Sequence, residues 1–597
     1  MRYIKENMEV YKQKKEIFTT ALTKINKKYN SVSIFRMLTI VLFVVSIYYY
    51  IKTNTIIFVV LSFFLFGLFI ALMRIHSKLL FQKQLNQALV DLNENEDFYL
   101  QRNKMPFENG QEFNDFHHPY AYDLDIFGEH SLFQNLNRTA TYIGKKTLAN
   151  QLLNILPNDE IARNHKAVKE LSEKLDWRQE FLAFAQISND KQSNYETLLK
   201  WSIFNSTPFS KSSIFISYFS PFLFLGVLVA YLVTSNMIFA TVLSYLFVFN
   251  LIILGRFTKR IQVEIANSSA IDKTIHQYSL LLKKIEQESF KSEKLIDLQQ
   301  KLLFKKENAS VHLKQLAGLF SKMDSISNFV TAIVFNGTFL FNLHVLKSLI
   351  QWKKDHADAL EDWLEVIGEF EMLNSLANLS FNNPEFTFPI LNTNFEIDFS
   401  NLSHPLLNEK TRIGNDVTFH PESFMILTGS NMSGKSTFLR SLGINMVLTG
   451  VGAPVCASHA NVHPLPVLVS MRLSDSLSDS ESYFFAEIKR LKQIMDELEN
   501  RPAFVLLDEI LRGTNSDDKR NGTIEVVKKV IGKKAVGAIA THDIEVCLTT
   551  NDYPNLLTNK CFEVEIINND LHFDYKLRDG ICKNRSATFL MKKMGVI

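Results

Sequence analysis

The sequence predicts a chain of two structural classes: an all-α region interrupted by two hairpins of apolar helices, and a C-terminal α/β domain. Three observations lead to this prediction. Two pairs of long, uncharged apolar runs occur in the first half of the chain. Residues 257–381 contain no proline, and apolar residues recur there at helical spacing. After Pro384, short β-branched runs alternate with helical patterns, which is typical of an α/β domain.

Length and composition restrict the class of protein further. The 597 residues are too many for one globular domain and indicate three or four units. With 46% apolar and 21% charged residues, disordered and fibrous proteins are excluded. The formal net charge of +3 neither requires nor excludes a polyanionic partner. The cysteines stand singly, so we expect a reducing compartment rather than a disulfide framework or a zinc ribbon. They are Cys456, Cys547, Cys561 and Cys582.

The apolar runs occupy residues 37–51, 55–73, 214–233 and 237–255. A helix needs about 20 apolar residues to cross the hydrocarbon core, with a lower limit near 17. The first run has 15 residues and reaches this limit only if its ends are extended. Buried core helices are the alternative, but soluble cores rarely contain two uncharged hairpins of this length. We therefore expect four transmembrane helices in two hairpins.

The flanking charges predict the orientation of these spans. Lysines and arginines precede and follow each hairpin, whereas the two turns, 52–54 and 234–236, contain only Lys52. The positive-inside rule then places both turns outside and the rest of the chain in the cytoplasm. A multi-pass protein of the cytoplasmic (inner) membrane is expected. A further apolar stretch, 330–346, contains asparagine and histidine and is interpreted as a core helix, with a fifth span as the alternative.

These features divide the chain into six predicted segments. In order they are a basic cytoplasmic N-terminal helix (1–36), a first transmembrane hairpin (37–75), a cytoplasmic segment (76–212), a second transmembrane hairpin (213–255), a helical core and lever region (256–383) and the α/β domain (384–597).

The strongest local motif is a phosphate loop in the α/β domain. Residues 429–436 fit G-x-x-x-x-G-K-[ST], with an apolar strand before them and an amphipathic helix after them, as the motif requires. The loop's N–H groups and the helix N-terminus favour an anion. Lys435 is expected to contact the β- and γ-phosphates, and Ser436 to ligate Mg²⁺. The predicted nucleotide contacts are Gly429, Ser430, Asn431, Met432, Ser433, Gly434, Lys435, Ser436 and Thr437.

Two further strand ends carry candidate catalytic residues. The apolar run 504–507 ends in Asp508 and Glu509 about seventy residues after the phosphate loop. Asp508 is placed for Mg²⁺, and Glu509 is a candidate to activate the attacking water. A third run, 535–540, is followed by His542, which would sense the γ-phosphate. Alone, the carboxylate pair would be interpreted as a solvated loop and the histidine as structural; beside the phosphate loop both indicate a P-loop ATPase domain of the ABC-like class.

At these motifs the sequence resembles the MutS family of DNA mismatch-repair ATPases. The loop TGSNMSGKSTFLR resembles that family's T-G-x-N-M-x-G-K-S-T-x-x-R, and LLDEILRGTNS and ATHD resemble its next two motifs. Residues 475–487 resemble its S-x-F-x-x-E signature, with Ser482 and Glu487 in the named places. The resemblance implies an ATP- and Mg²⁺-dependent homodimer in which Ser482 reaches the γ-phosphate bound by the partner subunit. It also implies DNA binding.

The resemblance continues upstream and covers about 120–200 and 257–597. It departs at the N-terminus, where a basic helix and a membrane hairpin stand in place of the family's mismatch-reading domain. We therefore expect ATP-driven dimer switching at the membrane, with DNA of mismatched or other structure bound in a repair or damage-sensing role. Lys301, Lys305, Lys306 and Lys314 are candidates for phosphate contacts.

Two alternatives stay open at this stage. A membrane-tethered ATPase switch acting on protein partners would use the same nucleotide residues. A transporter-type ATPase is less favoured, because the transporters' L-S-G-G-Q signature is absent from the sequence and the spans lack charged residues to line a pathway.

Overall fold

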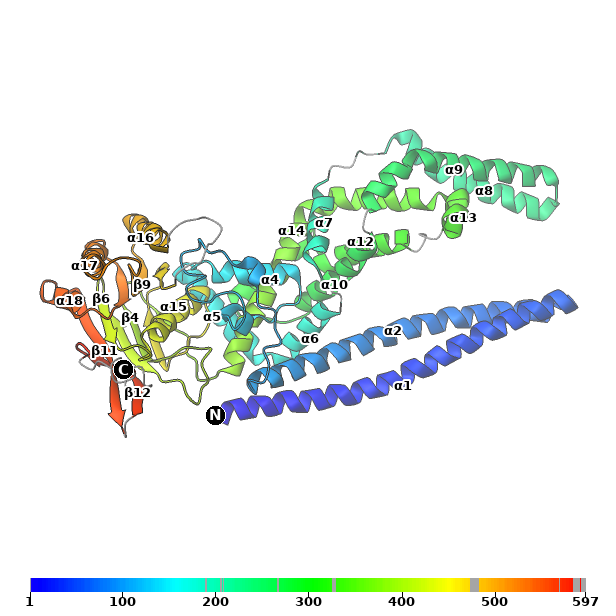
Figure 1. Cartoon of the computed structure of the whole chain (residues 1–597). Coiled ribbons are helices and arrows are strands. Elements are labelled where there is room, and N and C mark those ends of the chain that lie inside the picture. The colour runs from blue at the N-terminus through cyan, green and yellow to red at the C-terminus, as the bar shows by residue number, and fades with distance from the viewer. Residues whose placement is uncertain are drawn as a thin grey trace.

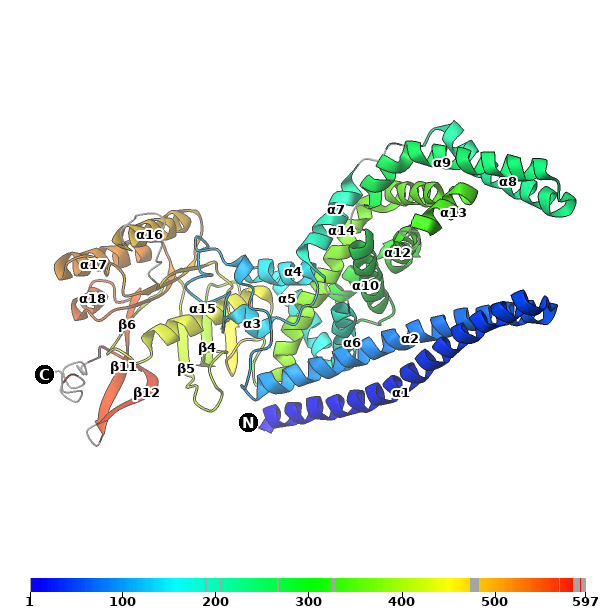
Figure 2. The ribbon, with the colours of Figure 1, turned by 45° about the vertical axis from the view of Figure 1, so that its right-hand side comes forward.

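The computed structural model describes residues 2–187, 190–204, 207, 209–265, 268–324, 329–472, 483–567, 570–582 and 591. The molecule is elongated (Figure 1). A β-sheet with its covering helices lies at one end, and the tips of two helical hairpins lie at the other. Both hairpins point away from the sheet in both views (Figures 1 and 2). One membrane plane can therefore accommodate both tips.

The first hairpin is formed by α1 (Arg2–Thr53) and α2 (Ile56–Leu100). The predicted basic helix and the first apolar run thus form one helix of 52 residues, about 78 Å long. Near the tip, the Ser46 hydroxyl donates to the Phe58 carbonyl oxygen (2.9 Å), and the Ser62 hydroxyl donates to Ser46 Oγ (3.1 Å). Most apolar side chains near the tip are exposed, and an apolar surface of this kind is unfavourable in water.

The second hairpin is formed by α8 (Lys211–Thr234) and α9 (Met237–Ile265), and α13 (Phe329–Phe339) packs on it. Asn250 accepts from the Ser220 hydroxyl (2.5 Å) and donates to the Gly337 carbonyl oxygen (2.8 Å). A side chain at Gly337 would collide with the Phe247 ring, so glycine allows α13 to lie flush against α9.

The expectation of one core helix over 330–346 is wrong. The chain turns at Leu340, whose φ is 50°, and α13 and α14 (Phe341–Asn382) meet there at 79°. The apolar run did not reveal this break because Leu340 is a good helix former by propensity. Within the described part of the chain, four helices are long and apolar enough to cross a membrane by length and composition, or five spans if the bent pair counts as one.

The helical region is organised around α14, which has 42 residues and is about 63 Å long. Its C-terminal half is the more buried part, because nearly every residue from Val366 to Leu379 is buried, and Trp363 and Phe370 are among the fully buried side chains. The elements around it include the 3₁₀ helix η1 (Gln111–Phe113), α3 (Leu132–Leu136), α4 (Tyr142–Leu152), α5 (Asn158–Glu173), α6 (Leu175–Gln186), α7 (Gln192–Ile203), α10 (Ser268–Glu286), α11 (Glu293–Gln300), the short strands β1 (Leu303–Phe304) and β2 (Glu307–Asn308), and α12 (Ala309–Asp324).

A buried ion pair ties the first hairpin to this region. Glu96 of α2 pairs with Arg138 (2.5 Å), and both side chains are almost completely buried. Glu96 also accepts from Asn378 (3.0 Å) and Asn382 (3.1 Å) at the end of α14. The Tyr11 hydroxyl of α1 donates to Asn382 Oδ1 (2.9 Å). Both helices of the hairpin are therefore fixed to α14 at their base.

A second buried ion pair ties α9 to α14. Lys353 of α14 pairs with Glu264 of α9 (2.8 Å), and their side chains are 6% and 2% exposed. The Trp201 indole of α7 donates to the same carboxylate (3.0 Å). Breaking a buried pair by removing one partner costs about 3–5 kcal/mol. The α14 helix thus carries both hairpins on one rod.

The main sheet of the α/β domain has, among the described residues, the strand order β12-β11-β6-β10-β9-β8. All neighbouring strands are parallel except the β11–β12 pair. The strands are β6 (Phe424–Gly429), β8 (Val467–Ser470), β9 (Phe504–Asp508), β10 (Val536–Ala540), β11 (Leu557–Ile567) and β12 (Asp570–Asp579). Every residue of β6, β9 and β10 is buried, as expected for a parallel sheet covered on both faces.

Helices cover both faces of the main sheet. On one face α15 (Lys435–Val451) packs on Leu427 and Leu506, and on the other α16 (Tyr483–Asn500), α17 (Ser516–Gly532) and α18 (Ile544–Leu548) pack on Ile426 and Leu507. The short 3₁₀ helix η2 (Thr549–Asn551) follows α18. The alternation of side chains along each strand places neighbouring residues on opposite faces.

A smaller sheet joins the main sheet to α14. In the described chain its strand order is β3-β7-β4-β5, with β3 (Ile390–Leu391), β4 (Ile397–Leu402), β5 (Asn415–Phe419) and β7 (His459–Val462). The segment between β4 and β5, residues 403–414, turns back toward the phosphate loop. This segment is called the β4–β5 loop below.

We predict that Glu371 makes stability depend on pH. It accepts from the N–H groups of Ala140 (2.8 Å) and Thr141 (3.3 Å), but burial raises its pKa from 4.5 to about 7. The folded state therefore favours the protonated form, and this contribution is lost as the pH rises from 4.5 to about 7. Thermal unfolding in detergent should show a loss of about 2–3 kcal/mol over that range.

The matched variants are Glu371→Gln, which is expected to remove most of this pH dependence, and Glu361→Gln, an exposed carboxylate on the same helix, which is expected to keep it. An equal pH dependence in Glu371→Gln and the wild type would contradict the assignment.

Candidate functional site

The phosphate loop lies between the end of β6 and the start of α15. Met432 and Gly434 have φ values of 68° and 103°, both in the left-handed region that allows a short loop to turn tightly. A Cβ at Gly434 would lie 3.0 Å from the Tyr575 ring. The first turn of α15 directs its N–H groups toward the hollow of this loop. Glycine at 434 is thus required both by the backbone angle and by the neighbouring ring.

Lys435, the first residue of α15, is buried under the loop. Its ammonium group donates to the carbonyl oxygens of Gly429 (3.0 Å) and Ser430 (3.1 Å). Burial lowers the pKa of Lys435, and the negative charges of Glu509 and Asp508 oppose this shift. The ammonium group is therefore held by weak neutral acceptors that an incoming phosphate can replace.

The sheet brings the three predicted strand ends together. β10 lies between β6 and β9, and its last residue, Ala540, is in register with Asp508 of β9. His542 follows two residues later, with Nε2 at 2.7 Å from Glu509 Oε1 and 3.4 Å from Lys435 Nζ. The imidazole N–H therefore donates to the carboxylate, and the histidine stands between the lysine and the glutamate.

Both the backbone conformation and the side-chain pKa of Glu509 differ from those of an ordinary glutamate. Its φ is 50°, a left-handed conformation that costs a non-glycine residue energy and recurs at functional sites. The hydrogen bond from His542 lowers the pKa of Glu509 to about 2. The side chain is consequently ionised at neutral pH and suited to orienting a water molecule more than to removing its proton.

Ser436 and Asp508 form a pair of oxygen donors that suits Mg²⁺. Burial raises the pKa of Asp508, and a hydrogen bond with the Ser436 side chain opposes this. The other carboxylate oxygen, Oδ1, is buried and has no hydrogen-bond partner among the described residues. No group of three or more His, Cys, Asp or Glu side chains within those residues is placed to hold a metal. Phosphate and water would therefore complete the shell, as Mg²⁺ prefers.

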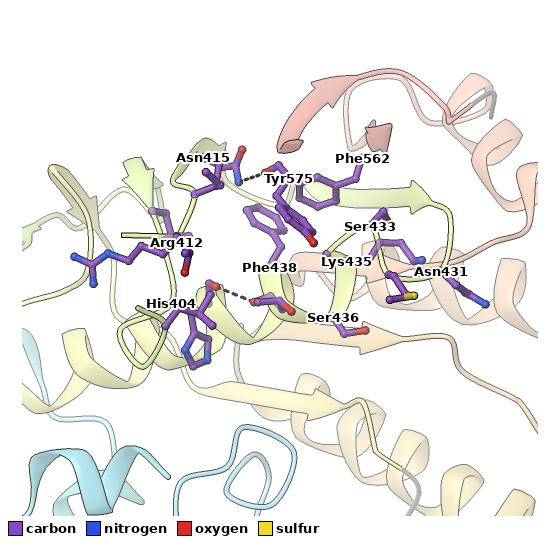
Figure 3. Close-up of a pocket in the computed structure, with 18 of the residues that line it drawn as sticks. His404, Arg412, Asn415, Asn431, Ser433, Lys435, Ser436, Phe438, Phe562 and Tyr575 are labelled. Carbon is purple, nitrogen blue, oxygen red and sulfur yellow. Dashed lines mark hydrogen bonds between the residues drawn. The ribbon is translucent and has the colours of Figure 1, made fainter. Parts of the chain in front are cut away.

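A cavity of about 580 Å³ opens beside the phosphate loop (Figure 3). Its remaining walls come from the β4–β5 loop and from β11 and β12. Phe438, Phe562 and Tyr575 line it with aromatic rings, and Asn415 fastens β12 by donating to the Tyr575 carbonyl oxygen (3.0 Å). Burial lowers the pKa of His404 in the wall to about 4, so this imidazole is neutral at physiological pH.

The two ends of the cavity differ in chemistry. One end has an ammonium group, a helix N-terminus and a hydroxyl–carboxylate pair, and the other has aromatic and aliphatic walls. A nucleoside triphosphate has the same division between charged phosphates and a planar base, and the volume is typical of small-molecule sites.

Several of these residues were missed by the sequence reasoning. The wall residues Leu402, His404, Leu407, Arg412, Phe562 and Tyr575 come from chain segments far from the phosphate loop and carry no local motif. Arg512 donates to the carbonyl oxygens of Asp508 (3.1 Å) and Glu509 (2.9 Å) and so fixes the strand end. Its place in the R-G-T motif was the available signal.

The other predicted residues lie as follows. Asn431, Met432, Ser436 and Thr437 line the cavity and are exposed, Ser433 lines it and is buried, and Gly429 is buried at the end of β6. Glu487 accepts from the N–H groups of Leu511 (2.7 Å) and Arg512 (3.2 Å), which links α16 to the loop after β9. Ser482 lies outside the described residues.

The match to a known family model falls in this domain. A family model described as MutS domain V matches residues 425–595. MutS protein homolog 4 of Homo sapiens is 26% identical over 247 residues, which cover 39% of this chain and 25% of that protein. DNA mismatch repair protein MutS of Thermotoga maritima is 26% identical over 258 residues (42% and 32%), and that of Methanococcoides burtonii is 32% identical over 196 residues (31% and 22%). The chain thus spans a third or less of these relatives' lengths.

We predict that Gly434→Ala lowers the affinity for ATP at least about tenfold. A side chain at φ 103° is strained, and its Cβ would press on Tyr575. Titration calorimetry checks this. Gly532→Ala, at the end of α17 with open space around the added methyl, is the matched control and should bind ATP as the wild type does. Equal affinity in both variants would show that the loop does not need its glycine.

Proposed function

We propose that this chain is a MutS-like, membrane-anchored ATPase whose two subunits close on ATP. The observation that carries the proposal is the cluster of Lys435, Asp508, Glu509 and His542 at three adjacent strand ends beside the cavity. Sequence segments separated by about a hundred residues converge there, as phosphoryl transfer requires.

Each residue of the cluster has a role that follows from its environment. Lys435 exchanges the loop carbonyl oxygens for the β- and γ-phosphates. Glu509 accepts a hydrogen bond from the attacking water and holds it in line with the γ-phosphate. His542 fixes Glu509 and reports on the phosphate, because it lies within reach of both Glu509 and Lys435. Arg512 keeps the strand end rigid.

Ser436 and Asp508 would hold Mg²⁺ in this scheme. The unpaired buried oxygen of Asp508 fits this role, because burial without a partner is costly until a cation or water satisfies it. When bound, the ion neutralises charge on the β- and γ-phosphates.

Membrane attachment is the second part of the proposal. The exposed apolar tips of α1–α2 and α8–α9 support it, as does the direction of both hairpins away from the main sheet (Figure 1). The positive charges at the hairpin bases favour insertion of the hairpins into the inner membrane with the ATPase domain on the cytoplasmic side.

We propose DNA as the partner class because of the sequence similarity to the relatives named above. Two of the relatives above carry the name DNA mismatch repair protein, although the alignments cover about two fifths of this chain or less. Lys301, Lys305, Lys306 and Lys314 are all exposed and could approach a phosphate backbone. Protein partners are the alternative, with a transporter-type ATPase less favoured. Crosslinking in cells, asking whether the helical region contacts DNA or protein, separates the first two.

We predict that Lys435→Ala abolishes ATP binding and that Glu509→Gln retains ATP while turnover falls about a hundredfold or more. The lysine supplies the phosphate contact, whereas the glutamate acts on the water. Nucleotide binding and phosphate release by the purified protein measure the two effects. Lys492→Ala removes an exposed lysine from α16 and should leave both unchanged. Normal turnover in Lys435→Ala would refute the site assignment.

We also predict that a non-hydrolysable ATP analogue converts monomers to dimers, seen by light scattering in detergent. Ser482→Ala and Lys435→Ala should each be inactive alone. Mixed subunits contain one intact composite site, so the mixture should recover about a quarter of wild-type turnover if pairing is random. Recovery fails if each subunit hydrolyses ATP independently, and that outcome would remove the dimer from the proposal.

A further inference from the structure

The first hairpin contacts the wall of the nucleotide cavity directly. Arg102 follows α2 by two residues. Its guanidinium donates to the carbonyl oxygens of Leu406 (3.2 Å) and Leu407 (2.9 Å) and pairs with Glu409 (3.3 Å). All three acceptors belong to the β4–β5 loop. The helix that carries one apolar run therefore ends on the loop that encloses the nucleotide.

The contact made by Arg102 lies beside the nucleotide cavity. Leu407 accepts from Arg102 through its carbonyl oxygen and also lines the nucleotide cavity. Arg412, in the same loop, lines both the nucleotide cavity and a neighbouring cavity of about 280 Å³ beside Arg102. Arg412 is itself held by an ion pair with Glu385 (3.0 Å). The two cavities share a wall, so a displacement of Arg102 alters the shape of the nucleotide cavity.

The base of the hairpin provides a pivot for such a displacement. Glu96 is fixed to α14 through Asn378 and Asn382, and α2 packs on α6 just before it. From this pivot α2 extends about 60 Å to its tip, and Arg102 lies about 9 Å beyond it on the other side. A tilt of about 10° moves Arg102 by about 1.6 Å. Hydrogen bonds of 2.9–3.2 Å do not survive such a change unless the loop follows.

The bilayer supplies a cause for tilt. The second apolar run, 55–73, has 19 residues, about 28 Å of helix, against a hydrocarbon core of about 30 Å on average. Where the hydrocarbon core is thinner than this run, the hairpin fits it by tilting, and where the core is thicker the bilayer thins around the hairpin instead, so bilayer thickness changes the angle of the hairpin.

We propose that Arg102 is a positioning residue through which the tilt of the α1–α2 hairpin regulates the affinity of the nucleotide site. The inference rests on the proposed ATP site and names its regulation. Arg102 does not touch the phosphates or the cluster at the strand ends; it holds the wall that encloses the nucleotide.

The test uses the full chain in phosphatidylcholine vesicles with acyl chains of about 14 or about 22 carbons, which differ in thickness. KM and kcat for ATP are measured in both. The wild-type KM should differ at least about threefold between them. Arg102→Ala should raise KM about tenfold in the bilayer that favours tight binding, make KM equal in the two bilayers, and change kcat less than about twofold.

Two further variants make the result specific. Lys104→Ala removes a charge two residues away that lines the same small cavity, and it should behave as the wild type. Arg102→Lys keeps the charge but reaches fewer acceptors, so part of the thickness response should remain. Melting temperatures within a few degrees of the wild type exclude unfolding as the cause.

The outcomes separate the two proposals. If the wild type hydrolyses ATP with the same KM in both bilayers, or if Arg102→Ala retains the thickness response, the regulation is refuted while the ATP site stands. If the wild type binds no ATP, the proposed function fails and this inference fails with it. A response lost in Arg102→Ala and kept in Lys104→Ala supports the proposal.

Discussion

The buried carboxylate of Glu96 is the constraint on which the arrangement of this protein depends. It receives hydrogen bonds from Arg138, Asn378 and Asn382, and thereby joins α2 to the connection before α4 and to the end of α14. A carboxylate with almost no exposure is stable only while these donors are present. The donors come from segments about 40 and 280 residues away, so the contact forms only when the whole helical region has folded.

The α14 helix determines how the two hairpins are placed relative to each other. Glu96 is held at its C-terminal end, and Glu264 is held at Lys353, about 30 residues earlier. The two apolar hairpins are consequently attached to one rigid rod and extend toward the same end of the molecule (Figure 2). Beyond this same C-terminal end, next to Glu96, α14 leads within a few residues into the α/β domain. Movement at the proposed membrane and movement at the nucleotide cavity are therefore connected through one continuous element.

The proposed nucleotide cavity is built from both consecutive and distant segments of the chain. Its floor is local, because the phosphate loop and the first turn of α15 are consecutive in sequence. Its walls are assembled from the β4–β5 loop, β11 and β12, and one of these walls is held from outside by Arg102. The floor is rigid, whereas the wall is anchored to a different part of the molecule. In such an arrangement the affinity for a ligand changes with the position of the wall, while the groups at the strand ends stay in place.

The sequence by itself determined the features that depend on consecutive residues. The G-x-x-x-x-G-K-S loop, the strand ends at Asp508 and His542 and the uncharged runs were predictable because each is specified by neighbours along the chain. The structure brings His542 within hydrogen-bond range of both Glu509 and Lys435, as the strand pattern suggested. Only the tertiary structure decided the break at Leu340, the aromatic wall with Tyr575, the buried role of Glu96 and the reach of Arg102. These depend on pairs of residues tens to hundreds of positions apart, and side-chain burial, which sets their energy, exists only once those segments have packed together.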